Sequence, residues 1–220
     1  MRIINLRLDT KNIERQKQFY SRVLELPIHS DSPDSFVVHL AHTKIYFKEN
    51  LNATPYHFAI NIPGHHESEA LFWLKERTSI IPYEDKEIID FKAWNAKSIY
   101  FYDENKNIVE LISRRNLSYS PQDKFDHNSL IEVSEIGLYT KSIASIYRYL
   151  NQNTGLEIFD GKLDSFCAIG DEHGLFITID KNKGTWFPSG DKAYPSPFGM
   201  EFVDNNHKFS FDYDGFEIIR

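Results

Sequence analysis

The sequence has 220 residues, a formal net charge of −7 and 41% hydrophobic side chains, with aromatic residues at 15%. This composition argues against a disordered chain, and the absence of a basic stripe argues against a nucleic-acid-binding protein. The single cysteine, Cys167, excludes an internal disulfide, and no apolar run resembles a secretory signal or a membrane span. We therefore expect a cytoplasmic protein with a packed core and neither nucleic acid nor membrane as a partner.

The first two units of the chain share one order of predicted elements, a strand followed by a helix and further strands. Alternating apolar residues predict the strands. Asn12 can cap the first helix, and Ala70, Leu71 and Leu74 form the apolar stripe of the second. The predicted strands lie at 3–8, 36–40, 44–48, 56–62, 86–93, 97–102 and 108–113, and the predicted helices at about 13–24 and 67–77.

A polar stretch without periodicity, residues 116–129, reads as a linker. In the third unit that follows, the spacing i, i+3, i+4, i+7 from Ile143 predicts a helix. The fourth unit shows no helical segment, so we interpret it as degenerate. The strands of these two units are predicted at 131–139, 165–169, 175–179, 198–203 and 209–219.

An internal repeat relates the first unit to the third, since residues 5–47 recur 130 positions later. Internal repetition defines the building block of a fold. The copies differ at Asn5 against Glu135 and at Tyr46 against Phe176, so we expect one functional half and one structural half. The shared positions include Leu8, Thr10, Lys11, Ile13, Leu26, Ile28 and Asp34-Ser35-Phe36, which return as Leu138, Thr140, Lys141, Ile143, Leu156, Ile158 and Asp164-Ser165-Phe166.

Three stretches carry a family resemblance. They are residues 8–26 with the pair Phe19-Tyr20, the strand His57-Phe58-Ala59-Ile60, and the hairpin at 102–111. In this order they resemble the vicinal oxygen chelate superfamily, the group of glyoxalases, bleomycin-resistance proteins and extradiol dioxygenases. The resemblance implies an α+β fold of tandem βαβββ modules, paired into half-open mixed sheet cups, with the fourth module degenerate and lacking its helix.

The expected domains are a first glyoxalase-like domain of two modules at 1–115, the linker at 116–129, and a second, truncated domain at 130–220. We expect one site, in the first domain. In the second half Glu135 and Glu217 could hold a hard cation, but the half lacks a matching imidazole and is interpreted as structural.

The resemblance also implies a divalent metal, held by residues on the first and last strands of the paired units. His57 and Glu110 match two ligand positions, and Asn5 occupies the third. Imidazole and carboxylate ligands leave open positions for a substrate with two neighbouring oxygens. The ion would be Mn, Zn, Ni, Mg or Fe. The alternative for Glu110 is a salt bridge to lysine or a hydrogen bond from tyrosine or histidine.

Tyr46, Trp94 and Tyr100 are assigned to the substrate pocket, with core or rim packing as the alternative for Trp94. The predicted function is a glyoxalase-like, divalent-metal-dependent enzyme, of isomerase, lyase or thiol transferase type, for a small oxygenated substrate. Glu110 could also act as the catalytic base, because burial raises the pKa of a carboxyl group. The alternative is a metal-free small-molecule or antibiotic-binding protein. We expect a monomer or a homodimer.

Overall fold

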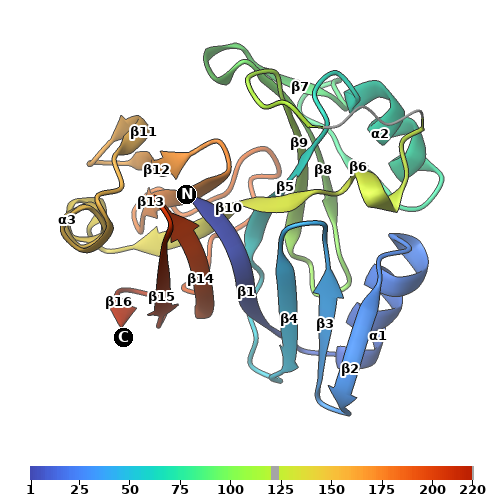
Figure 1. The fold of residues 1–220 in the computed structure, drawn as a ribbon, viewed down its shortest axis with the longest axis horizontal. Helices are drawn as coiled ribbons and strands as arrows, with labels where there is room; N and C mark the ends of the chain where they lie inside the picture. Colours follow the sequence, from blue (N-terminus) through green and yellow to red (C-terminus); the bar gives the residue numbers. More distant parts are fainter. Residues whose placement is uncertain (120–123, 220) are drawn as a thin grey trace.

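The computed structural model describes residues 1–119 and 124–219, in which two mixed β-sheets are accompanied by three α-helices (Figure 1). The predicted α+β fold is confirmed. Residues 120–123 of the predicted linker lie outside the described residues. The flanking part is packed, because Phe125 is buried against Trp73 with ring centroids 5.6 Å apart.

Sheet A has seven strands in the order β16-β15-β14-β1-β4-β3-β2. It joins the first predicted unit to the fourth. No helix separates the strands of the fourth unit within its described residues, as the sequence predicted. The strands are β1 (Arg2–Thr10), β2 (Ile28–Ser32), β3 (Ser35–His39), β4 (Lys44–Glu49), β14 (Phe198–Asp204), β15 (His207–Tyr213) and β16 (Ile218–Ile219).

Sheet B has the order β11-β12-β13-β10-β5-β9-β8-β6, with β7 paired to β8. It joins the second unit to the third. Its strands are β5 (His57–Ile62), β6 (Ile80–Ile81), β7 (Ile89–Phe91), β8 (Ala96–Tyr102), β9 (Ile108–Arg114), β10 (Glu132–Thr140), β11 (Ile158–Lys162), β12 (Phe166–Asp171) and β13 (Gly174–Asp180).

This pairing of units corrects one sequence expectation. The first and second units were expected to share a cup, but β1 pairs with β14, where Asn5 faces Glu201, and β10 pairs with β5, where Glu135 faces Ala59. The physical reason is that the free edge of each first strand can pair with that of another unit, and tandem order does not select the partner. Both sheets therefore cross the predicted boundary at residue 115, and the division into domains remains a prediction.

The main core lies between the sheets. On β5, Phe58, Ile60 and Ile62 point into this core, because alternate side chains of a strand share a face. The opposite face of the same strand carries His57 and Ala59. Each sheet thus turns its outer face to a separate cavity, one of about 460 Å³ at sheet B and one of about 650 Å³ at sheet A. We call these the B cavity and the A cavity.

The helices cover the core with their apolar sides. Asn12 caps α1 as predicted, accepting a hydrogen bond from the Arg15 amide at 3.0 Å, and Ser142 caps α3 in the same way. Gly155, at a φ of +78°, ends α3. The helices are α1 (Ile13–Gln18), followed by a π-helical turn (Phe19–Val23), α2 (Glu67–Lys75) and α3 (Ile143–Thr154).

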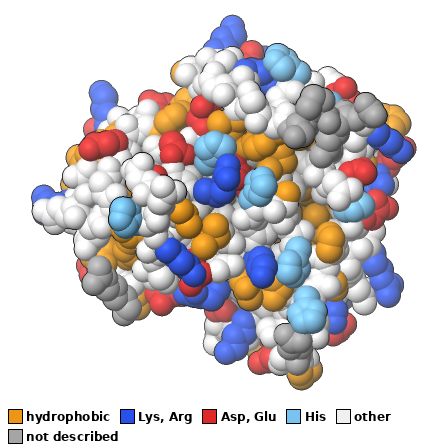
Figure 2. Space-filling view, in the orientation of Figure 1, with side chains coloured by type: hydrophobic (Ala, Val, Ile, Leu, Met, Phe, Trp, Pro, Cys, Tyr) orange, Lys and Arg blue, Asp and Glu red, His pale blue; other side chains and the backbone are white. Residues whose placement is uncertain are grey.

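No helix in the described part of the chain is long and apolar enough to cross a membrane. On the face shown in Figure 2, acidic and basic side chains are mixed and no large patch of one sign forms.

Candidate metal centre in the B cavity

Three buried side chains converge at the floor of the B cavity. His57 projects from β5, Glu110 from the neighbouring β9, and Glu135 from β10 on the other side of β5. One ligand atom from each lies within 4.8 Å of the other two. All three are at most 5% exposed. An imidazole and two carboxylates at this spacing form a donor set suited to a divalent cation.

The imidazole of His57 presents a free nitrogen. Its Nδ1 lies 3.3 Å from the Ile108 carbonyl oxygen, which can only accept, so Nδ1 carries the hydrogen. Nε2 then has a lone pair and lies 3.7 Å from Glu110 Oε2. Burial lowers the pKa of His57 to about 4, so the ring is neutral near pH 7. A neutral imidazole oriented by a backbone carbonyl is the form in which histidine binds metals.

The two carboxyl groups are less easily ionised than usual. Burial raises the pKa of Glu110, and the neighbouring Glu135 raises it further. The nearby hydroxyl groups of Ser98 and Tyr100 lower it in part. Burial also raises the pKa of Glu135, against the effect of Arg114. A divalent cation bound at this floor would stabilise the ionised forms of both carboxyl groups, since a buried charge is costly unless it is paired.

Arg114 is the cation already present, and it is fully buried at the end of β9. Its Nη2 is hydrogen bonded to Oε1 of Glu135, and its Nε donates to Asn61 Oδ1 at 3.2 Å. The guanidinium carbon lies 5.6 Å from the centroid of the Trp94 ring. Arg114 therefore neutralises Glu135 while leaving the second carboxylate oxygen of that residue outside the hydrogen bond.

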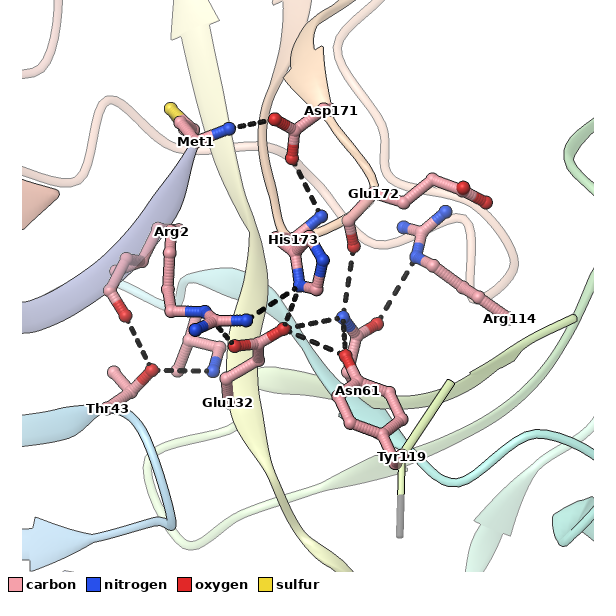
Figure 3. Close-up of polar contacts among 12 residues, drawn as sticks. Met1, Arg2, Thr43, Asn61, Arg114, Tyr119, Glu132, Asp171, Glu172 and His173 are labelled. Atoms are coloured by element: carbon pink, nitrogen blue, oxygen red, sulfur yellow. Dashed lines mark hydrogen bonds and ion pairs between the residues drawn. The ribbon is translucent and has the colours of Figure 1, made fainter. Parts of the chain in front are cut away.

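A polar network fixes Asn61, and through it Arg114 (Figure 3). The Asn61 amide group donates to the Glu172 carbonyl oxygen at 3.0 Å. It also donates to Glu132, which accepts a further hydrogen bond from Tyr119 and lies 2.7 Å from His173 Nδ1. The network runs along sheet B toward the surface, where His173 is partly exposed. It holds the guanidinium in one orientation against Glu135.

Apolar and aromatic side chains form the walls of the B cavity above this floor. Trp186 covers His57, with ring centroids 5.3 Å apart, and packs on Gly137, which has no Cβ to obstruct it. Charged side chains lie nearer the mouth. The lining comprises Phe91, Ala93, Trp94, Tyr100, Ile112, Phe166, Ile177, Ile179, Thr185, Trp186 and Phe187, with Lys92, Asp160 and Lys183 as its other charged members.

The structure brings four of the six predicted site residues together. His57, Glu110, Trp94 and Tyr100 all line the B cavity. Asn5 does not, because it lies on β1 in sheet A, where its side chain donates to Glu201. Tyr46 lines the A cavity instead. The expectation that Asn5 completes the metal site and that Tyr46 lines the same pocket is therefore wrong, because β1 pairs with β14 of the fourth unit and β4 pairs with β1 in that same sheet.

Glu135 was missed as a partner of His57, although the repeat placed it at the position of Asn5. The repeat also misassigned one residue. In sheet A Arg7 faces Tyr46, and in sheet B Gly137 faces Ile177, so the equivalent of Tyr46 is Ile177 rather than Phe176. An apolar side chain thus takes the place where a fourth ligand from β13 would stand. Glu217, the other acidic residue considered, lies in the turn before β16.

No family model matches this sequence, and no curated protein matches it. Among solved structures, glyoxalase I from Zea mays superposes with a TM-score of 0.55 at 12% identity, covering 97% of this chain and 92% of that one. A mutant form of the same Zea mays enzyme gives 0.57, also at 12% identity, covering 96% and 93%. A "putative dioxygenase" from Bacillus subtilis gives 0.60 at 15% identity, covering 81% of this chain and 63% of that protein, so the chain spans under two thirds of its length. At these identities the likeness establishes the fold.

Proposed function

We propose, from the vicinal oxygen chelate fold that this chain has, that it is a metal-dependent enzyme acting on a small molecule with two neighbouring oxygens. The observation that carries the proposal is the convergence of His57, Glu110 and Glu135 at the floor of the B cavity. A glyoxalase-type isomerase, lyase or thiol transferase reaction is compatible with this site. The substrate would enter a cavity whose volume is in the range of small-molecule sites.

The donor set fits a divalent ion on chemical grounds. His57 is neutral with its Nε2 free, and Glu110 and Glu135 offer oxygen ligands. Mixed nitrogen and oxygen donors suit Mn, Zn, Ni or Fe. Mg prefers oxygen ligands, so it would bind mainly through the two carboxylates. Since Ile177 stands where a fourth protein ligand would be, three donors would leave positions for a bidentate substrate. When bound, such an ion supplies Lewis-acid polarisation of a substrate oxygen.

The protein groups around the ion have separate roles in this proposal. Glu110 is the catalytic acid–base, because its carboxyl group lies at the floor of the cavity beside the metal position, where it can exchange a proton with a bound substrate. Tyr100 lies beside it and supports its ionised form. Arg114 orients Glu135, and Trp186 shields the floor from water.

Metal binding to purified protein tests this function. The protein is stripped with a chelator and titrated with Co²⁺, Mn²⁺, Zn²⁺ and Ni²⁺ by calorimetry, with Co²⁺ absorption as a second readout. We expect one ion per chain, and a loss of affinity of at least about tenfold in His57→Ala, Glu110→Gln and Glu135→Gln. Glu201→Gln, which changes a carboxylate of sheet A, and His39→Ala serve as matched controls and should bind as the wild type does.

The second candidate function is a metal-free binding protein. The observation that favours it is the ion pair between Arg114 and Glu135, because an internal cation already balances one carboxylate. If none of the four ions binds, or if binding is unchanged in all three floor variants, the enzyme proposal is wrong and this second function stands.

A further inference from the structure

We propose that the ligand of the B cavity is an aromatic anion, with its ring held by a belt of aromatic side chains and its anionic group bound by Lys92 and Lys183 at the mouth. This inference deepens the proposed function, since it concerns the same cavity, but ring and anion recognition do not require the metal.

The aromatic belt is continuous from the mouth of the cavity to its floor. Neighbouring rings along it lie between 5.3 and 6.2 Å apart by centroid distance, the range of favourable aromatic pairs. Flat apolar ligands gain most from such a surface, because ring faces and edges offer both stacked and edge-on contacts. In order, the belt consists of Phe159, Trp94, Phe91, Phe187, Tyr100, His57 and Trp186.

Part of this belt is exposed: Phe187 lines the cavity, and Phe159 lies beyond the lining, in contact with Trp94. Phe187 is 43% exposed and Phe159 is 36% exposed, whereas Tyr100 and Trp186 are buried. Trp94 is held in position by its indole N–H, which donates to Asp160 at 2.5 Å. The belt therefore has a fixed buried end and an accessible end, so that a ring can enter along it.

The cations are placed to bind an anion at the mouth. Lys183 lies over the Phe166 ring with its Nζ 5.2 Å from the centroid, and Lys92 lines the same cavity. Both are exposed. Asp160 is the one acidic side chain of the lining outside the floor, and its carboxylate is hydrogen bonded to Trp94 and to the Gly161 amide. The lysines therefore dominate the charge available to a ligand.

The floor fixes the orientation of such a ligand. The floor offers no unpaired cation to an anionic group placed deep in the cavity, since the buried Arg114 is already paired with Glu135. The anionic group is thus directed outward to the lysines, and the ring inward to the belt. Oxygens on the ring or on its first side-chain carbon would then face His57 and Glu110.

The test uses the metal-free full chain and three probes that separate ring from charge. These are 1-naphthoate, its uncharged analogue 1-naphthalenemethanol, and cyclohexanecarboxylate, which has the charge without the aromatic ring. We expect 1-naphthoate to bind with a dissociation constant below about 1 mM, and each of the other two to bind at least about tenfold more weakly, by calorimetry or ligand-observed NMR.

Variants assign the two parts of the recognition. Lys92→Met/Lys183→Met should weaken 1-naphthoate about tenfold and leave 1-naphthalenemethanol unchanged, whereas Lys181→Met, outside the cavity, should change neither. Trp94→Leu should weaken both aromatic probes. Phe72→Leu, which changes an exposed ring of α2 that is 69% exposed, should weaken neither.

The outcomes separate this inference from the proposed function. If 1-naphthoate fails to bind, or binds no better than the other two probes, the aromatic-anion inference is overturned, even where metal titration succeeds. Binding that is insensitive to both lysines also overturns it. If 1-naphthoate binds as expected while no metal binds, the inference is supported and the metal-dependent function is the part that fails.

Discussion

The charge balance of the cavity floor depends on Arg114, a fully buried guanidinium. Its partners Glu135 and Asn61 are also buried, so the pair is not screened by solvent. Removing one member of a buried ion pair leaves an uncompensated charge, which is far costlier than replacing both by apolar groups. Arg114 therefore offsets the cost of burying the Glu135 carboxylate when no metal is bound.

Arg114→Met should lower the free energy of unfolding of the metal-free protein by about 3–5 kcal/mol, because Glu135 loses its cation. Arg114→Met/Glu135→Leu should recover most of this loss. Urea denaturation measures both. The neighbouring Arg115→Met removes a less buried partner of Glu67 and is the matched control, with a smaller expected loss of about 1 kcal/mol. Equal losses in the single and double variants would contradict the account.

Gly137 determines where the Trp186 indole lies. A Cβ at this position would approach two ring carbons of Trp186 to 2.8 Å and the His57 carbonyl oxygen to 3.1 Å. Gly137→Ala should therefore displace Trp186 and lower stability by about 1–3 kcal/mol. In Gly137→Ala/Trp186→Leu the second change removes the clash. The loss of stability in this double variant, measured by thermal unfolding, should therefore be smaller than the sum of the losses in the two single variants. Additive losses would show that the indole is not the obstacle.

At residue scale, the sequence predicted the chemistry of the floor in part. His57 and Glu110 follow from alternation in two strands and from the family resemblance. Glu135 could not be paired with them, since its side chain reaches the floor only through the pairing of β10 with β5. Arg114 could not be assigned to the floor either, because nothing local in the sequence shows that Asn61 and Glu135 surround its side chain.

Between elements, the contact of α1 with the turn joining β8 to β9 depends on Asp103. This buried carboxylate accepts hydrogen bonds from Gln16 at 2.5 Å, from Tyr20 at 2.9 Å and from the Asn107 amide at 3.0 Å. Burial raises its pKa to about 6. Asp103 thus ties the first unit to the second across the two sheets.

The raised pKa gives Asp103 a defined effect on stability against pH. The folded protein binds this proton more tightly than the unfolded chain, whose aspartates titrate near 3.9. The contribution of Asp103 to stability is therefore complete below about pH 4 and is lost as the pH rises through about 6.

Asp103→Asn should remove that dependence. The free energy of unfolding of the wild type minus that of Asp103→Asn should fall by about 2–3 kcal/mol between pH 4 and pH 7. The altered hydrogen bonds of the variant add a difference that does not depend on pH. Urea denaturation at four pH values measures the difference, and Asp85→Asn provides a control at an exposed carboxylate. If the difference in stability between the wild type and Asp103→Asn does not vary with pH, the raised pKa of Asp103 is contradicted.

At element scale, strands with alternating apolar residues were predictable and short edge strands were not. The strands β2 and β6 carry too few residues or too little alternation to be seen, and every residue of β11 is exposed. The strand predicted at 209–219 is divided into β15 and β16. The missing helix of the fourth unit was predictable, because no helical segment lies between the predicted strands at 198–203 and 209–219. The one-residue shift between Tyr46 and Ile177 was not, since only the sheet register reveals it.

For the whole molecule, the decisive feature is that the first unit pairs with the fourth. Engineered cysteines test it directly in a Cys167→Ser background. Asn5→Cys/Glu201→Cys joins residues that face each other in β1 and β14, so we expect a disulfide under mild oxidation. The resulting loop of nearly 200 residues should stabilise the oxidised protein by about 4–5 kcal/mol.

The matched control tests the pairing that the sequence favoured. If the first two units shared a cup, β1 would pair with β5, and the cysteines of Asn5→Cys/Ala59→Cys would lie close enough to form a disulfide. These residues belong to different sheets, so we expect no intramolecular disulfide in this variant. Non-reducing electrophoresis and intact mass distinguish the two proteins. Efficient cross-linking of the second pair alone would contradict the topology.

The order of pairing also bears on synthesis by the ribosome. Sheet B closes with strands from residues 57–180, so the cavity floor can assemble before the C-terminal unit is translated. The β1 edge must wait for β14, whose first residue is Phe198. At about 5–20 residues per second, β1 stays without this partner for roughly 10–40 s after it is translated. During that interval the nascent chain presents an open strand edge, the kind of surface that chaperones and aggregation compete for.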